Sequence, residues 1–137
     1  MPDAVLAARI RTELLKSPEH HDQSFYLDGV RLLTPEGDLT DGLRDCGTTL
    51  CVAGYAAHLT GHTIEVLDEA VNEPVIAYRE GEAPRLVSVV AQAELGLSGD
   101  DAAWLFWGRR SREEVLAALG QLADGAPRID IPAATAA

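Results

Sequence analysis

The sequence predicts a small, helix-rich α+β domain, and three observations lead to that class. The chain has 137 residues, 47% of them apolar, which suits one domain with one core. Apolar residues recur at helical spacing towards both ends of the chain. Between them stand two short runs rich in β-branched residues. We therefore expect a single domain over residues 1–137, built around a buried central helix at about residues 49–60.

The first element is a helix over residues 3–16, with Pro18 just beyond its end, where proline stops a helix. Its apolar stripe consists of Val5, Leu6, Ile10, Leu14 and Leu15. Residues 24–33 fit neither the helical nor the strand period, so an extended segment and a short helix both remain open. Residues 34–42 are dense in turn formers and predict a loop.

The central helix lies within the stretch DCGTTLCVAGYAAHLTG, residues 45–61. Thr48 or Thr49 can cap its start, and Gly61 supplies the left-handed residue that ends a helix. Gly54 lowers helix propensity, which suggests that a neighbouring element packs closely against it. We expect most of this helix to be buried, because its residues are small and apolar.

The segment CGTTLCVAGYA, residues 46–56, resembles a C-G-T-x-x-C-x-A-G box of small uncharacterised bacterial and phage proteins. Those proteins also tend to carry an L-G-L-S turn followed by a helix that ends in L-F. Here the turn is LGLS at residues 95–98, and Leu105 and Phe106 follow it. The resemblance implies a phage-related or mobile-element-related origin, but no activity and no catalytic residue.

After the central helix, residues 62–67 and 74–78 suit two strands that could pair as a hairpin. Three helices are expected beyond them. The first starts near Pro84, a residue favoured at the first helical position. Its expected apolar face consists of Leu86, Val89, Val90 and Ala93. The second is capped by Ser98, and the third carries a capping box of Ser111 and Glu114. The tail, residues 129–137, is expected to be frayed unless it docks.

The charge balance limits the possible partners. Eleven basic residues face twenty-two acidic ones, a net charge of −11. Direct nucleic-acid binding is therefore not expected, because it requires clustered cations. No apolar run approaches the length of a membrane span, so no membrane partner is expected. With two cysteines and no secretion signal, a cytoplasmic location is expected.

Four side chains suggest metal or redox chemistry: Cys46, Cys51, His58 and His62. Within a helix, the last three would fall on one face at successive steps, and a thiol near the helix N-terminus can have a lowered pKa. A zinc site or a thiol switch is therefore the alternative reading. The spacing is not an established zinc pattern, so we favour a structural role and expect no cofactor.

Catalytic motifs are missing from the sequence. It contains no phosphate-binding loop, and residues 96–100, GLSGD, fail the G-x-S-x-G pattern. Acidic pairs at residues 100–101 and 113–114 stand at expected helix starts, where the helix dipole explains them. The sequence therefore leans away from an enzyme.

A protein-binding surface is the favoured functional prediction. Trp104 and Trp107 belong to four consecutive large apolar residues, more than one helix face can bury. Arg109 and Arg110 follow, and tryptophan beside arginine is typical of binding hot spots. Burial of all four residues in the core is the open alternative, since core and interface look alike in sequence. We therefore expect a small acidic binding or accessory module that contacts a protein partner. A second copy is the simplest partner, and such a homodimer should strengthen with added salt.

Overall fold

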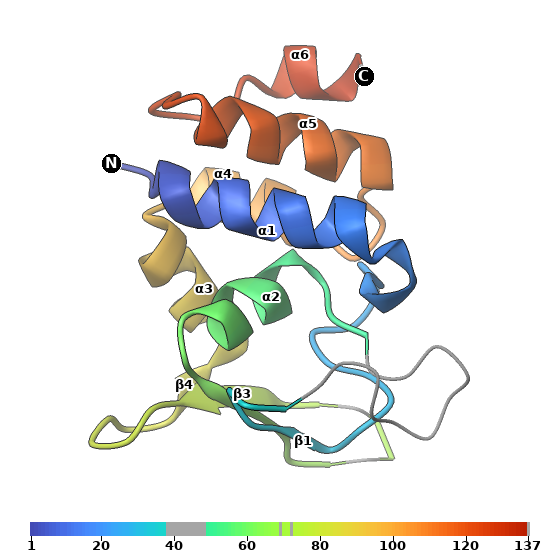
Figure 1. The fold of residues 1–137 in the computed structure, drawn as a ribbon, viewed down its shortest axis with the longest axis vertical. Helices are drawn as coiled ribbons and strands as arrows, with labels where there is room; N and C mark the ends of the chain where they lie inside the picture. Colours follow the sequence, from blue (N-terminus) through green and yellow to red (C-terminus); the bar gives the residue numbers. More distant parts are fainter. Residues whose placement is uncertain (38–48, 69, 72, 137) are drawn as a thin grey trace.

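Two helices from opposite ends of the chain lie side by side in the computed structural model, which describes residues 1–37, 49–68, 70–71 and 73–136. They are α1 (Ala4–Lys16) and α5 (Arg112–Ala123). Arg11 Nε donates to Leu116 O at 3.2 Å, and Arg112 Nη2 donates to Leu14 O at 2.5 Å. Two hydrogen bonds in the C-terminal half of α1 thus fix it along α5, and both helices lie above α2 and the sheet in Figure 1.

The repeat of apolar residues in α1 is buried, but the buried stripe is narrower than predicted. Leu6, Ile10 and Leu14 are buried, whereas Val5 and Leu15 are 79% and 50% exposed. Residues one position away from the four-residue repeat lie towards the flank of the helix, where α5 does not cover them. The turn after α1 is a short 3-10 helix, η1 (Pro18–His20).

The central helix is α2 (Val52–Leu59), and it packs against α1, against α3 (Val87–Leu95) and against the sheet. In Figure 1 it lies between α1 and the sheet. All of its residues from Val52 to Ala57 are buried, which confirms the predicted buried helix. It starts later than expected, because Thr49 pairs with Asp28 in an isolated β-bridge and Cys51 becomes the N-cap. Gly61 has φ +85°, as its predicted role requires.

The sheet is antiparallel, with strand order β1-β2-β3-β4. Strands β2 (Thr63–Val66) and β3 (Val75–Tyr78) form the predicted hairpin, with Ile64 opposite Ala77. The two-residue strands β1 (Leu32–Leu33) and β4 (Arg85–Leu86) extend it at either edge. Residues 24–31 form no regular element, so only the last part of the ambiguous segment is extended.

The predicted helix start at Pro84 is wrong by three residues. Arg85 and Leu86 pair with β3 before α3 begins at Val87. The buried side of α3 is therefore formed by Val87, Val90, Ala91 and Leu95 rather than by the expected Leu86, Val89, Val90 and Ala93. This shift leaves Leu86 and Val89 about half exposed, at 50% and 47%.

Both predicted caps of the later helices are present. Ser98 accepts a hydrogen bond from Asp101 N at the start of α4 (Gly99–Leu105), and Ser111 with Glu114 forms the capping box of α5. The chain end forms a fourth C-terminal helix, α6 (Ile131–Thr135), which packs on α5. Ile129 N donates to the buried Asp101 Oδ2 at 3.1 Å, so the tail is tied to the start of α4.

The whole is a helix-rich α+β domain, as the sequence predicts. Within the described ranges, every helix falls short of the length and hydrophobicity that crossing a bilayer would need.

Candidate functional site

The segment before α2 brings residues 21–28 against the N-terminus of the central helix. Leu50 N donates to His20 O at 2.8 Å, and Cys51 N donates to Phe25 O at 3.0 Å. The backbone of Tyr26 passes so close to α2 that a Cβ on Gly54 would lie 2.2 Å from Tyr26 O. The close approach predicted at Gly54 is therefore made by this irregular segment, and it fixes where Tyr26 sits.

Cys51 does not have the lowered pKa that its position suggests. The side chain is 1% exposed, and burial raises the pKa of its thiol to about 11, more than the nearby backbone amides lower it. Desolvation disfavours the thiolate, and here it outweighs the helix N-terminus. The alternative reading of an activated thiol at Cys51 therefore gains no support from this burial. Cys46 lies outside the described residues, as does Thr48.

The two histidines of the candidate metal set lie apart. His58 is on α2 near Arg9 and Glu13 of α1, and burial lowers its pKa. His62 follows Gly61, outside the helix, where its Nδ1 lies 2.9 Å from Thr60 Oγ1. The helix ends at Leu59, so the predicted common face does not form. In the described part of the chain, no group of three or more His, Cys, Asp or Glu side chains could hold a metal ion.

Tyr26 lies at the meeting point of three hollows, which we call together the Tyr26 groove. The first, about 290 Å³, lies between α3 and α4. The second, about 180 Å³, lies between Glu73–Val75 and the start of α3. The third, about 180 Å³, reaches down to Gln23 and Cys51. The second and third hollows share Glu73, and the first and third share Phe106.

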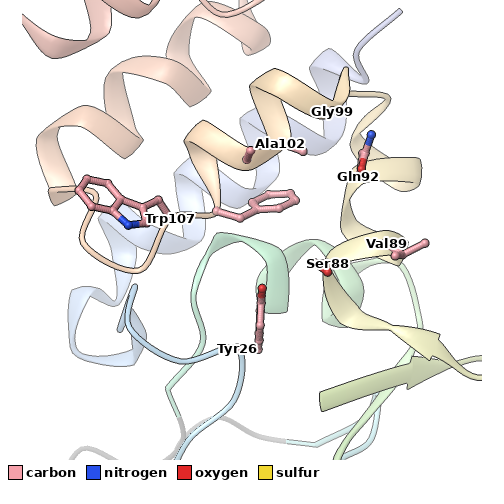
Figure 2. Close-up of a pocket in the computed structure, with 9 residues that line it drawn as sticks. Tyr26, Ser88, Val89, Gln92, Gly99, Ala102 and Trp107 are labelled. Carbon is pink, nitrogen blue, oxygen red and sulfur yellow. The ribbon is translucent and has the colours of Figure 1, made fainter. Parts of the chain in front are cut away.

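Figure 2 shows the first hollow, with the ring of Tyr26 rising from its loop towards α4. The α3 side carries Ser88, Val89 and Gln92, and the α4 side carries Gly99 and Ala102. Trp107 lies at the end of the hollow opposite Val89. Burial raises the pKa of the Tyr26 hydroxyl, with a further contribution from Cys51, while a hydrogen bond with Ser88 lowers it. Tyr26 is therefore a neutral phenol that forms the floor of the groove.

Gln23 holds one side of the groove together. Its Nε2 donates to Leu105 O at 2.8 Å and to Trp107 O at 3.3 Å. Its Oε1 accepts from Val52 N at 3.5 Å, a long contact with the first residue of α2. A single side chain thus joins the end of α4 to the start of α2.

The aromatic run does not form one continuous helix. Helix α4 ends at Leu105, which is fully buried, and Phe106 is its C-cap. Trp104 and Phe106 are partly buried against the core, and Trp107 lies beyond the helix with 51% of its surface exposed. Trp107 therefore lies beyond the end of the helix, where it reaches the rim of the groove.

The two arginines of the predicted interface have different surroundings. The Arg110 guanidinium lies 4.1 Å from the ring centre of Trp104 and 4.7 Å from that of Trp107. Its Nε donates to Trp104 O at 3.0 Å, and its Nη1 lies 3.4 Å from Glu114 Oε2. Arg110 is thus used within the domain, as a cation–π partner of both tryptophans. Arg109 is exposed.

Sequence reasoning named one residue of the groove, Trp107, as a binding residue and missed Tyr26, Val89 and Glu73. Tyr26 stands in the segment that fits no period, so its position depends on the contact with Gly54. The sequence places Val89 on the buried face because it predicts an earlier start of α3. A strand of two residues leaves no pattern in the sequence, and so no signal pointed to the shift.

The lining of the groove is nearly free of charge. Among the described residues that line the three hollows, Glu73 alone carries a formal charge. The polar side chains beside it are Gln23, Ser24, Tyr26, Cys51, Ser88 and Gln92.

Comparison of the chain with protein-family models, with curated proteins and with solved structures finds no match in any of the three. The resemblance to small bacterial and phage proteins therefore stays a prediction based on residues 46–56 and 95–106.

Proposed function

We propose that this chain is a small acidic binding module that contacts another protein through the Tyr26 groove. One observation carries the proposal. Three of the large apolar side chains that remain exposed, Leu86, Val89 and Trp107, line the same groove. Each is about half exposed, at 50%, 47% and 51%. Clustered apolar surface of this kind is typical of interaction sites, whereas scattered single residues need no explanation.

The composition of the groove suits a protein partner. Tyrosine, tryptophan and phenylalanine are enriched at the centres of protein interfaces, and Tyr26, Phe106 and Trp107 all line the groove. Its first hollow, about 290 Å³, lies at or below the lower end of the roughly 300–1,000 Å³ typical of small-molecule sites. A single apolar side chain on a larger partner fits such a hollow better than a cofactor does.

The competing proposal, cysteine-based redox or zinc chemistry, has less support. Cys51 lines the third hollow, but its thiol is 1% exposed and has a pKa of about 11. A redox cysteine normally carries a low pKa and an accessible sulfur. Metal analysis of the purified chain, together with a thiol titration, measures this alternative directly.

A selection of displayed random peptides on the purified chain tests the binding function. Selected peptides are then measured against two variants with the same substitution, Val89→Glu in the groove and Val5→Glu on α1. Both positions are exposed valines in helices, at 47% and 79%. We expect binding to persist with Val5→Glu and to be lost with Val89→Glu. Peptides that bind both variants equally, or no enrichment at all, would overturn the proposal.

The homodimer remains one version of this proposal. The mass of the chain in solution, measured at two concentrations and two salt levels, distinguishes a second copy from a different partner. A dimer that uses the groove should form more readily in added salt, which screens the repulsion between two chains of charge −11. Val89→Glu should then lower the measured mass, whereas Val5→Glu should not.

A further inference from the structure

We propose that the Tyr26 groove takes a partner segment that combines an apolar side chain with a nearby lysine or arginine. The apolar side chain would enter the first hollow, between α3 and α4, and the cation would pair with Glu73. The inference rests on the proposed binding function and names the chemistry of the partner.

The two parts of the groove differ in character and lie next to each other. The first hollow is walled by Val89, Ala102, Ala103, Phe106 and Trp107, none of which is charged. Tyr26 and Ser88 also line the second hollow, which Glu73 borders. A segment that fills the first hollow therefore meets Glu73 as soon as it passes Tyr26.

Glu73 is available for a partner. It is exposed, and none of the described cations forms an ion pair with its carboxylate. Two arginines near the sheet pair with a different carboxylate, that of Glu82. Arg79 lies 2.6 Å from it and Arg85 lies 3.7 Å from it. Glu73 borders the third hollow as well as the second, so it stands beside Tyr26 at two sides of the groove.

The charge of the chain favours a basic segment over the other occupants. A second copy carries the same net charge of −11, so two copies repel each other at long range. Nucleic acid carries a negatively charged phosphate on each nucleotide and is repelled in the same way. A cation in the groove is instead attracted, because the Glu73 carboxylate has no ion-pair partner among the described cations. The aromatic rings of the groove can also form cation–π contacts with a guanidinium or ammonium group. Arg109 is exposed and directly follows Gly108, which lines the third hollow. Arg109 itself lines none of the three hollows, so it does not compete with a partner's cation there.

An array of synthetic peptides measures this preference. Each peptide carries one leucine, phenylalanine or tryptophan, with lysine, glutamine or glutamate placed at stepped distances from it. The array is probed with the parent chain, with Glu73→Lys and with Glu80→Lys. Glu80 is an exposed glutamate in the turn before Gly81, outside the groove, so it controls for the change in net charge.

We expect the parent to bind lysine peptides about two- to fivefold more tightly than matched glutamine peptides, the range of a solvent-accessible ion pair. This preference should shrink in added salt. Glu73→Lys should reverse the preference towards glutamate peptides, whereas Glu80→Lys should keep the order of the parent.

Two failures can be told apart. The role of Glu73 would be overturned if peptides bind through their apolar residue but show no charge preference. It would also be overturned if Glu73→Lys leaves a charge preference unchanged. Both results would leave the binding function standing. An array on which no apolar residue supports binding to the parent would overturn both. The unfolding midpoints of Glu73→Lys and Glu80→Lys are compared with that of the parent. Equal midpoints establish that a change in peptide binding does not come from misfolding.

Discussion

The contact between Gly54 and the Tyr26 carbonyl gives a sharp test of the architecture. A Cβ added at Gly54 would lie 2.2 Å from Tyr26 O and 2.8 Å from Leu50 Cδ2. Carbon–oxygen contacts near 3 Å are already tight, so Gly54→Ala must move the Tyr26 segment by about 1 Å, given the optimum of about 3.5 Å. Overpacking of this kind costs about 1–3 kcal/mol. We expect the upper part of that range, because the obstructing atom belongs to the main chain.

Helix propensity works in the opposite direction, since alanine favours a helix over glycine by about 0.5–1 kcal/mol. The net loss for Gly54→Ala should therefore be about 1–2 kcal/mol, which corresponds to a fall in Tm of roughly 3–10 °C for a chain of this size. Gly120→Ala in α5 is the matched control. Its new Cβ would lie 3.5 Å from Arg11 Nε, an ordinary contact. We expect this control to gain about 0.5–1 kcal/mol.

Urea unfolding of the parent and both alanine variants measures these differences, with circular dichroism as the probe. If Gly54→Ala proves as stable as Gly120→Ala, Tyr26 does not pack on α2 as described, and the geometry of the groove must be different. Binding of the selected peptides gives a second reading of the same contact. A displaced Tyr26 should weaken peptide binding in Gly54→Ala, even at temperatures where that variant is fully folded.

Three further predictions concern single side chains. Burial is the main cause of the lowered pKa of His62, so the fold prefers its neutral form and the unfolded chain binds the proton first. The free energy of unfolding should therefore fall as the pH drops below about 6.5, the pKa of histidine in the unfolded chain. His62→Asn should make this fall smaller, which denaturant midpoints measured above and below that pH would show. Cys51, as the only thiol of a Cys46→Ser variant, should react slowly with a disulfide reagent at neutral pH and much faster in urea; equal rates in both would contradict its burial. Arg110→Gln should raise iodide quenching of tryptophan fluorescence because the guanidinium covers both rings, while Arg109→Gln should leave quenching unchanged.

Local signals in the sequence predict most of the helices correctly. The four-residue repeat of Leu6, Ile10 and Leu14 identifies α1, and the hydroxyls of Ser98 and Ser111 identify the starts of α4 and α5. These signals succeed because capping and amphipathic burial depend on residues close together in the chain. The prediction that Gly61 ends the central helix is correct for the same reason, since a positive φ is a local requirement.

Features that depend on distant partners could not be predicted in this way. Strands β1 and β4 have two residues each and exist because β2 and β3 offer them hydrogen bonds. The start of α3 moves with β4, and this move turns Val89 from a predicted core residue into a half-exposed wall of the groove. For Cys51, the sequence shows the helix start that would lower its pKa but not the covering by residues 21–28 that raises it.

The pairing of α1 with α5 also bears on how the chain folds as it is synthesised. Arg11 bonds to Leu116 and Arg112 bonds to Leu14, across 105 and 98 positions in sequence. While the ribosome is still adding residues before α5, the side of α1 that packs on α5 has no partner to cover it. Closing such long loops costs entropy before the contact stabilises the fold, which slows folding and makes it cooperative. A nascent or truncated chain that stops short of residue 112 should therefore expose part of the apolar stripe of α1, and it should be a target for chaperones and proteases.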